Sequence, residues 1–275
     1  MESSCNKSVV VLLVGYFLLS DFLCIISTMP APAPPMAATH NKMGYSIEAI
    51  DPYTGIFLQR MRGARKPVAE LGSGFGIVTE HLLAAGATVI ANDLSADNLR
   101  EVEQRVPVEQ RSRLTLVPGD ATQMTFPDNG LSGIMAGRWV HFLTTPEAYR
   151  DFLGKAWTWL EPGGALCITV HTMKAWCPPE VNQEYERKRD SGVEWPGWVN
   201  RTMLYEGLTG RVPDLVYAFQ PQELKALVEA AGFVVDDIGL YGLALPNHPS
   251  TEDNDLAEGN TLGLVAIKPI ANAIT

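Results

Sequence analysis

Short apolar runs alternate with amphipathic stretches through the middle of the chain. The apolar runs have the length of buried strands, and the stretches between them carry apolar residues at helical spacing. The expected strands begin at Val68 and continue with 88–93, 114–117, 131–137, 165–170, 233–240 and 261–267, and the expected helices cover 77–85, 96–106 and 220–232. Strands that alternate with helices are typical of a parallel sheet covered on both faces. The pattern therefore predicts an α/β, doubly wound fold.

A turn with three glycines joins the first expected strand to the first expected helix. Gly72, Gly74 and Gly76 stand at alternate positions behind the carboxylate of Glu70. Glycine has no Cβ and tolerates positive φ, so such a turn lets a ligand approach the backbone closely. The dinucleotide fingerprint places its third glycine where this chain has Ile77, which disfavours a dinucleotide. A tight connection without a ligand is the alternative for this motif taken alone.

Two further acidic residues stand at strand ends. Asp93 ends the second expected strand, and Asp120 follows the third in a Gly-Asp turn. Right-handed crossovers bring the carboxyl ends of parallel strands to one edge of the sheet. An acid at the tip of the second strand can accept hydrogen bonds from both hydroxyls of a ribose. Without a ligand, Asp93 would only lead into a helix capped by Ser95, and Asp120 would only belong to a turn.

The order of these motifs resembles one enzyme family. The chain resembles the class I S-adenosylmethionine-dependent methyltransferases in five places. These are Glu-x-Gly-x-Gly-x-Gly over 70–76, Asp93, Asp120, the segment 138–143 after the fourth strand, and the Glu161-Pro-Gly-Gly164 turn before the fifth. The resemblance implies S-adenosylmethionine as the cofactor and methyl transfer as the reaction. It also implies a Rossmann-like, doubly wound seven-stranded sheet of order 3-2-1-4-5-7-6, whose last two strands form an antiparallel hairpin.

The resemblance further implies roles for individual residues. Glu70 would bind the methionine end of the cofactor, Asp93 its ribose and Asp120 its adenine amino group. Arg138 would hold the methionine carboxylate or an acidic substrate, with an exposed salt bridge as the alternative. The full set of expected cofactor-binding residues is Glu70, Gly72, Ser73, Gly74, Gly76, Asp93, Leu94, Asp120, Ala121 and Arg138.

Candidate catalytic residues follow from the reaction. Transfer of a methyl group from a sulfonium requires the protein mainly to position two reactants, and an oxygen or nitrogen acceptor can also need a base. His141, after the fourth strand, is the first candidate, and His171, at the end of the fifth, is the second. A histidine that only packs in the wall of the site is the alternative. We expect no metal site, since the four cysteines form no Cys-x-x-Cys pair.

Aromatic residues suggest where a methyl acceptor would lie. An insertion at about 172–214 contains three of the six tryptophans, which favours either an aromatic-rich lid or packing against the core. The expected substrate contacts are Tyr45, Trp139, Trp176, Trp195 and Trp198. These residues favour an apolar or planar small molecule. For the reaction we expect methylation on oxygen or nitrogen, although the sequence does not identify the methylated atom.

The charge of the chain bears on its partners. The formal net charge is −10, and Glu2, Lys7, Asp21 and Lys42 cancel within residues 1–43. The whole surplus of negative charge therefore lies in 44–275. Such a domain repels phosphate backbones, so we expect a small-molecule acceptor and no nucleic acid. The oligomeric state does not follow from the sequence.

The amino-terminal segment predicts a location. Residues 9–27 are almost wholly apolar, close to the roughly 20 residues that span a bilayer. We expect a membrane anchor or signal at 1–28, a Pro/Ala linker at 29–43 and a methyltransferase domain at 44–275. Asp21 is costly at membrane depth, and a clean cleavage site is missing. Translation from a later methionine is the alternative, and it would make the protein cytoplasmic instead of membrane-associated or directed to the secretory pathway.

Two other functions are compatible with the same fold. One is a membrane-tethered module that binds the cofactor without turnover. The other is an aminopropyl transferase, although the Gly-Gly-Gly-Asp-Gly-Gly motif typical of those enzymes is not found in this chain.

Overall fold

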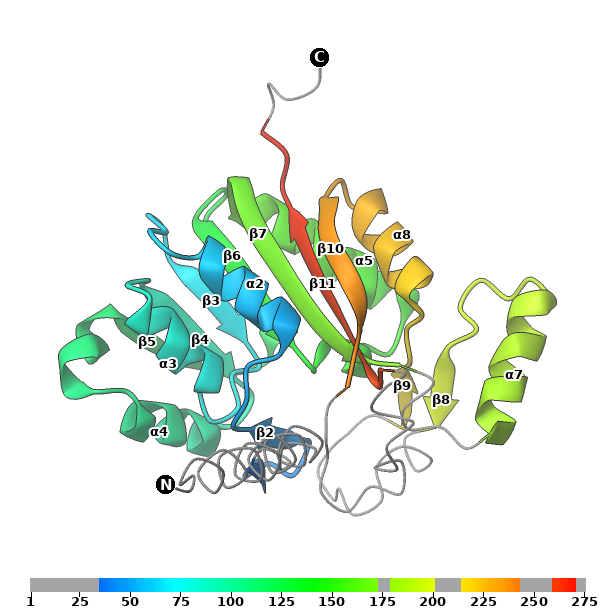
Figure 1. The fold of residues 1–275 in the computed structure, drawn as a ribbon, viewed down its shortest axis with the longest axis horizontal. Coiled ribbons are helices and arrows are strands. Elements are labelled where there is room, and N and C mark those ends of the chain that lie inside the picture. Colours follow the sequence, from blue (N-terminus) through cyan, green and yellow to red (C-terminus); the bar gives the residue numbers. More distant parts are fainter. Residues whose placement is uncertain (1–34, 173–178, 201–213, 243–258, 271–275) are drawn as a thin grey trace, which may run out of the picture. The chain divides into compact units, whose positions relative to one another are not determined.

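The computed structural model describes residues 35–172, 179–200, 214–242 and 259–270 (Figure 1). Their centre is a seven-stranded sheet in which β10 is followed by β11, β7, β6, β3, β4 and β5. The strands are β3 (Val68–Leu71), β4 (Val89–Asp93), β5 (Leu114–Pro118), β6 (Leu131–Gly137), β7 (Leu160–His171), β10 (Val234–Tyr241) and β11 (Thr261–Ile267).

The pairing of these strands matches the expected fold class. The five strands from β5 to β7 pair in parallel, and β11 pairs antiparallel with both β7 and β10. Counted along the chain, the order is 3-2-1-4-5-7-6. The α/β, doubly wound, Rossmann-like fold is therefore confirmed.

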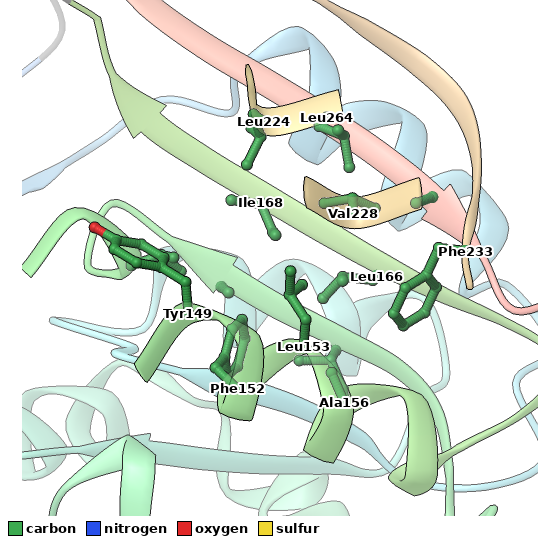
Figure 2. Close-up of a cluster of buried hydrophobic side chains, with 14 of the residues drawn as sticks. Tyr149, Phe152, Leu153, Ala156, Leu166, Ile168, Leu224, Val228, Phe233 and Leu264 are labelled. Carbon is green, nitrogen blue, oxygen red and sulfur yellow. The ribbon is translucent and has the colours of Figure 1, made fainter. Parts of the chain in front are cut away.

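Helices pack on the two faces of the sheet through two separate apolar clusters. One cluster contains residues of α2 (Pro52–Arg60), α3 (Ile77–Ala84) and α4 (Ala96–Arg105), and the other contains residues of α5 (Pro146–Trp159) and α8 (Pro221–Ala230). Successive side chains of a strand point to opposite faces. In β7, Leu166 and Ile168 belong to the α5/α8 cluster, whereas Ala165 and Cys167 belong to the other. Figure 2 shows the α5/α8 cluster, with Phe152 and Leu153 of α5 beside Leu166 and Ile168 of β7.

Local signals explain where several helices begin. Ser95 caps α4 by accepting a hydrogen bond from the Asn98 backbone N–H at 3.3 Å, as predicted. Thr145 caps α5, whose first residue is Pro146. Gly76 precedes α3 with φ +80°, and a Cβ there would lie 2.9 Å from a methyl carbon of Val102 in α4. Gly76 therefore allows α3 and α4 to pack closely.

Strand β7 begins earlier than the sequence pattern suggested. The expected Glu161–Gly164 turn lies inside β7, which starts at Leu160. Gly163 has φ +85°, and the pairing with β6 shifts register between Leu131 and Gly133. The turn residues thus bend the strand without ending it, because an irregular register absorbs the glycine conformation.

The expected linker at 29–43 differs from the structure in its second half. β1 (Met36–Ala38) pairs antiparallel with β2 (Tyr45–Ile47), so residues 36–43 belong to the folded unit. The Pro/Ala composition concealed this strand, because it is held by its pairing with β2 and has no apolar pattern of its own. Within the described part of the chain, no helix is long and apolar enough to cross a membrane. Residues 9–27 lie outside that part, and their anchor or signal role stays a prediction.

The insertion has more regular structure than expected. It contains α7 (Pro179–Asp190) and β8 (Trp198–Asn200), and β8 pairs antiparallel with β9 (Leu215–Tyr217). Three short 3₁₀ helices complete the described elements: η1 (Val108–Arg113), η2 (Ala121–Gln123) and η3 (Val140–Phe142).

Candidate cofactor and catalytic site

A cavity of about 350 Å³ lies at the carboxyl ends of the parallel strands. This edge of an open α/β sheet is where ligands bind in proteins of this architecture. Most of the predicted site residues line the cavity, namely Tyr45, Glu70, Gly72, Ser73, Gly74, Asp93, Leu94, Asp120, Ala121, Arg138, Trp139, His141 and His171. The structure therefore brings into one site residues that are spread along the sequence from Tyr45 to His171.

The glycine turn after β3 is held against the end of β4. The backbone N–H groups of Gly72 and Ser73 both donate to the Asn92 carbonyl at 2.9 Å. Gly72 has φ +75°, and a Cβ added there would lie 2.8 Å from Cδ1 of Trp139. Glycine at this position thus allows the turn to touch the Trp139 ring at the wall of the cavity.

Asp93 organises this side of the cavity. Its Oδ2 accepts a hydrogen bond from the Gly74 N–H at 2.9 Å. Its Oδ1 accepts bonds from the Ser95 N–H at 2.8 Å and from Asn98 Nδ2 at 2.9 Å. A carboxylate offers about four lone-pair sites, so about one remains for a ligand. A ligand donor can therefore still bond to Asp93, and the expected contact with the ribose hydroxyls stays a prediction.

Glu70 is buried beside the turn. Thr79 Oγ1 of α3 donates a hydrogen bond to its carboxylate. The pKa of Glu70 is raised to about 8, chiefly by burial and also by the charge of Asp93, while the bond from Thr79 and the charge of Arg138 act in the opposite direction. In the ligand-free protein, Glu70 therefore keeps its proton at neutral pH.

Glu70→Gln is expected to flatten the pH dependence of stability. The folded protein holds a proton that the unfolded chain releases above the ordinary pKa of 4.5, so the free energy of unfolding falls as pH rises from 4.5 to about 8. The slope for one proton is about 1.4 kcal/mol per pH unit. Urea unfolding of the ligand-free protein across this range measures it. Equal slopes in the two proteins would show that Glu70 is ionised in the folded state.

His141 and His171 meet at the wall of the cavity. η3 carries His141, β7 ends at His171, and their ring centroids are 4.7 Å apart. Burial lowers the pKa of His141 well below its ordinary value, and the charges of His171 and Arg138 lower it further. His141 is thus uncharged at neutral pH, the form in which an imidazole accepts a proton.

Arg138 follows β6 in a conformation that long side chains rarely adopt. Its φ is +56°, and its backbone N–H donates to the Thr169 carbonyl at 2.8 Å. Within the described residues, its guanidinium makes no hydrogen bond or ion pair, so the predicted alternative of an exposed salt bridge is not observed. A half-buried cation at the cavity wall offers a place for an anionic group of a ligand.

Asp120, Ala121 and Leu94 lie at the predicted adenine end. Asp120 caps η2, and its Oδ1 accepts bonds from the Thr122 N–H and hydroxyl, each at 2.8 Å. Leu94 is 56% exposed although it follows a buried strand. An exposed apolar side chain beside a capped turn is consistent with a flat ring packing there, and the adenine role of these residues stays a prediction.

Three predicted residues are not among those that line the cavity. Gly76 serves helix packing, as described above. Trp195 lies 5.5 Å from the Tyr149 ring and 5.1 Å from Tyr217, and Trp198 also lies 5.1 Å from Tyr217. Both tryptophans pack on the α5 side of the core, which supports packing over a lid for these two positions. Trp176 lies outside the described residues.

Several residues of the site escaped the sequence analysis. Asn92 is fully buried, and its Nδ2 donates to the carbonyls of Val117 and Gly119, each at 2.9 Å, which ties β4 to the turn after β5. Asn98 contacts Asp93 from α4. The only sequence signal for Asn92 was its polar side chain inside an apolar strand. The only signal for Asn98 was its position about one helical turn after Asp93.

Unpaired polar atoms show what kind of ligand the cavity fits. The Ser73 hydroxyl, Asn92 Oδ1 and Trp139 Nε1 are buried and have no hydrogen-bond partner among the described residues. All three residues line the cavity. Buried polar groups are normally paired, because an unmade bond costs roughly 1–3 kcal/mol. The cavity thus suits a ligand with several hydrogen-bonding groups.

A family model matches the central part of the chain. Residues 69–168 match a family model described as a methyltransferase domain. That range contains the glycine turn, Asp93, Asp120 and the segment around His141. No curated protein sequence matches the chain.

Solved structures share the fold. A SAM-dependent methyltransferase from Methanosarcina mazei is 17% identical, with a TM-score of 0.57, and the match covers 80% of this chain and 98% of that one. The 1,6-didemethyltoxoflavin-N1-methyltransferase of Burkholderia thailandensis is 17% identical, with a TM-score of 0.53, covering 98% and 93%. Phosphoethanolamine N-methyltransferase 2 of Haemonchus contortus is 17% identical, with a TM-score of 0.51, covering 79% and 52%.

The fold is that of S-adenosylmethionine-dependent methyltransferases. The chain contains a methyltransferase domain, it is an enzyme, and S-adenosylmethionine is its cofactor. The residues of the cavity fit this group: hydroxyl, amine and carboxylate groups of the cofactor suit the unpaired atoms of Ser73, Asn92 and Trp139 and the charge of Arg138.

Proposed function

We propose that this enzyme methylates an oxygen or nitrogen atom of a small-molecule acceptor. The observation that carries the proposal is the pair of imidazoles, His141 and His171, in the same cavity as the glycine turn. Bound S-adenosylmethionine supplies an electrophilic methyl group. An uncharged His141 is suited to take the proton that an O–H or N–H acceptor loses, and His171 is placed to contact His141 or the acceptor.

The glycine turn and three acids, Glu70, Asp93 and Asp120, would hold the cofactor in the cavity. Gly72 to Gly74 would lie against the cofactor, Glu70 and Arg138 would contact its amino-acid part, and Asp93 would accept a bond from its ribose. Asp120 and Ala121 would contact the adenine. Placing these groups on strand ends and short turns fixes the reactants relative to each other, which is the main contribution of the protein to such a displacement.

The acceptor would enter between the histidines and the aromatic residues of the wall. Trp139 lines the cavity beside the glycine turn. Tyr45, which comes before that turn in the sequence, also lines the cavity and is 37% exposed. Both residues offer flat apolar surface with a polar tip. The Burkholderia and Haemonchus enzymes are N-methyltransferases of small molecules by their names, which supports a small acceptor here.

A screen with isotopically labelled cofactor tests the proposal. The full chain is incubated with S-adenosylmethionine labelled on the methyl group and with phenols, carboxylates, amines and nitrogen heterocycles, and label is sought in the products by mass spectrometry. Transfer to at least one O–H or N–H compound is expected, with none to DNA or RNA. Cofactor binding without transfer to any acceptor, or transfer of an aminopropyl group, would contradict the proposal.

A further inference from the structure

A buried amide connects the amino-terminal hairpin to the carboxylate of Asp93. Asn98 is 1% exposed on α4. Its Nδ2 donates to Asp93 Oδ1 at 2.9 Å, and its Oδ1 accepts from the backbone N–H of His40 at 3.0 Å. The amide orientation is unambiguous, because a carboxylate can only accept and an N–H can only donate.

The hairpin that Asn98 contacts forms one wall of the cofactor cavity. We define the N-terminal hairpin as residues 36–47, which contain β1, β2 and their connecting turn. Asn41, Met43, Tyr45 and Ile47 of this hairpin line the cavity. The hairpin also lies over the glycine turn, since a Cβ added at Gly74 would be 3.7 Å from Ser46 Oγ.

The other polar anchors of the hairpin region are exposed or only partly buried. His40 Nε2 lies 2.9 Å from Glu101 Oε1, with both side chains 40–45% exposed. Arg105 forms an ion pair with Glu48 just beyond the hairpin. Exposed pairs of this kind contribute little, because water competes for both partners. A buried bond to the Asn98 amide, itself bonded to a carboxylate, is the stronger anchor.

We propose that Asn98 is a positioning residue that holds the N-terminal hairpin closed over the cofactor and keeps Asp93 oriented towards it. The inference rests on the proposed function in one respect, namely that Asp93 binds the cofactor. Loss of the Asn98 amide would remove the anchor of the hairpin and, at the same time, one of the hydrogen bonds that orient Asp93. The expected consequence is faster escape of the bound cofactor or its product, with little change in the methyl-transfer step.

Two substitutions of one residue separate the backbone bond from the side-chain bond. Lys42 N–H donates to the Thr39 carbonyl at 2.8 Å, so His40 is the second residue of a β-turn, a position that proline favours. His40→Pro removes the N–H that Asn98 accepts, and also the imidazole. His40→Ala removes only the imidazole and its contact with Glu101. The difference between the two variants reports on the link to Asn98.

The dissociation rate of S-adenosylhomocysteine from the full chain, measured by stopped flow, is the readout. We expect His40→Ala to stay within about threefold of the wild type and His40→Pro to release the ligand about tenfold faster or more. Asn98→Ala is expected to release the ligand at least as fast as His40→Pro. The kcat of His40→Pro at saturating cofactor should stay within about threefold of the wild type. Restored retention in Asn98→Gln, relative to Asn98→Ala, would point further to a bridging amide.

The outcomes distinguish this inference from the proposed function. Equal dissociation rates in His40→Pro and His40→Ala would overturn the link, as would Asn98→Ala that lowers the melting temperature and leaves the rate unchanged. If His40→Pro does not fold, the dissociation rates of Asn98→Ala and His40→Ala are compared instead, and equal rates would overturn the link. A wild-type chain that binds no S-adenosylhomocysteine would overturn the proposed function, and the inference with it.

Discussion

Asp93→Ala is expected to weaken cofactor binding by at least 100-fold, about 2.7 kcal/mol. The carboxylate meets the donors of Gly74, Ser95 and Asn98 and has about one lone-pair site left for a ligand hydroxyl. Its removal leaves these donors without their acceptor and takes away one of the bonds that hold the glycine turn to the end of β4. Each buried donor left unpaired costs roughly 1–3 kcal/mol, so stability should also fall by several kcal/mol.

Isothermal titration calorimetry with S-adenosylhomocysteine measures the binding loss, and urea unfolding measures the stability loss. Asp97→Ala is the matched control, because Asp97 is an exposed acid in the first turn of the same helix, paired only with Arg100. Its removal should change stability by no more than roughly 1 kcal/mol and leave affinity unchanged. Wild-type affinity in a folded Asp93→Ala protein would show that Asp93 does not bind the cofactor.

His141→Asn is expected to lower kcat by about 10²–10⁴-fold if the histidine removes a proton from the acceptor. Asparagine can still form hydrogen bonds in the wall of the cavity, but it cannot take a proton near neutral pH. The KM for the cofactor should stay within a few-fold, because the proposed cofactor contacts are made by other residues. His81→Asn provides the control, since His81 on α3 is exposed and its Nδ1 lies 2.8 Å from the carbonyl of Ile77.

The pH profile separates a catalytic His141 from a structural one. Burial and the charges of His171 and Arg138 hold the pKa of His141 well below the ordinary 6.5. The base form therefore persists as pH falls through 6.5, and kcat of the wild type should show no decrease from His141 in that region. A His141→Asn enzyme with unchanged kcat and only a lower melting temperature would assign the residue to packing.

The cofactor half of the site was largely predictable from local patterns. Gly72, Gly74, Asp93 and Asp120 stand where strands end, and the carboxyl ends of parallel strands must gather at one edge. Periodicity placed the seven strands of the sheet to within a few residues. Strand β7 was the exception, because an irregular register let its glycine turn remain in the sheet.

Contacts between distant segments were not predictable. The pairing of β1 with β2 and the bond from His40 to Asn98 join segments whose composition resembles a linker and a polar helix face. Trp195 and Trp198 suggested a lid by their abundance, yet the structure packs both near Tyr217. Aromatic residues favour burial wherever apolar surface is available, and a sequence does not show which surface that is.

The sequence alone determined the fold class, the strand order implied by the resemblance and the positions of the glycine turn and its acids, because these depend on short-range periodicity and on glycine conformations. Only the tertiary structure decided that His141 and His171 face each other, that Arg138 lacks a partner among the described residues and that Asn98 bridges Asp93 to the hairpin. Those relations are set by the packing of helices and turns on the sheet, where burial changes the charge state of a side chain and brings together groups that are far apart along the chain.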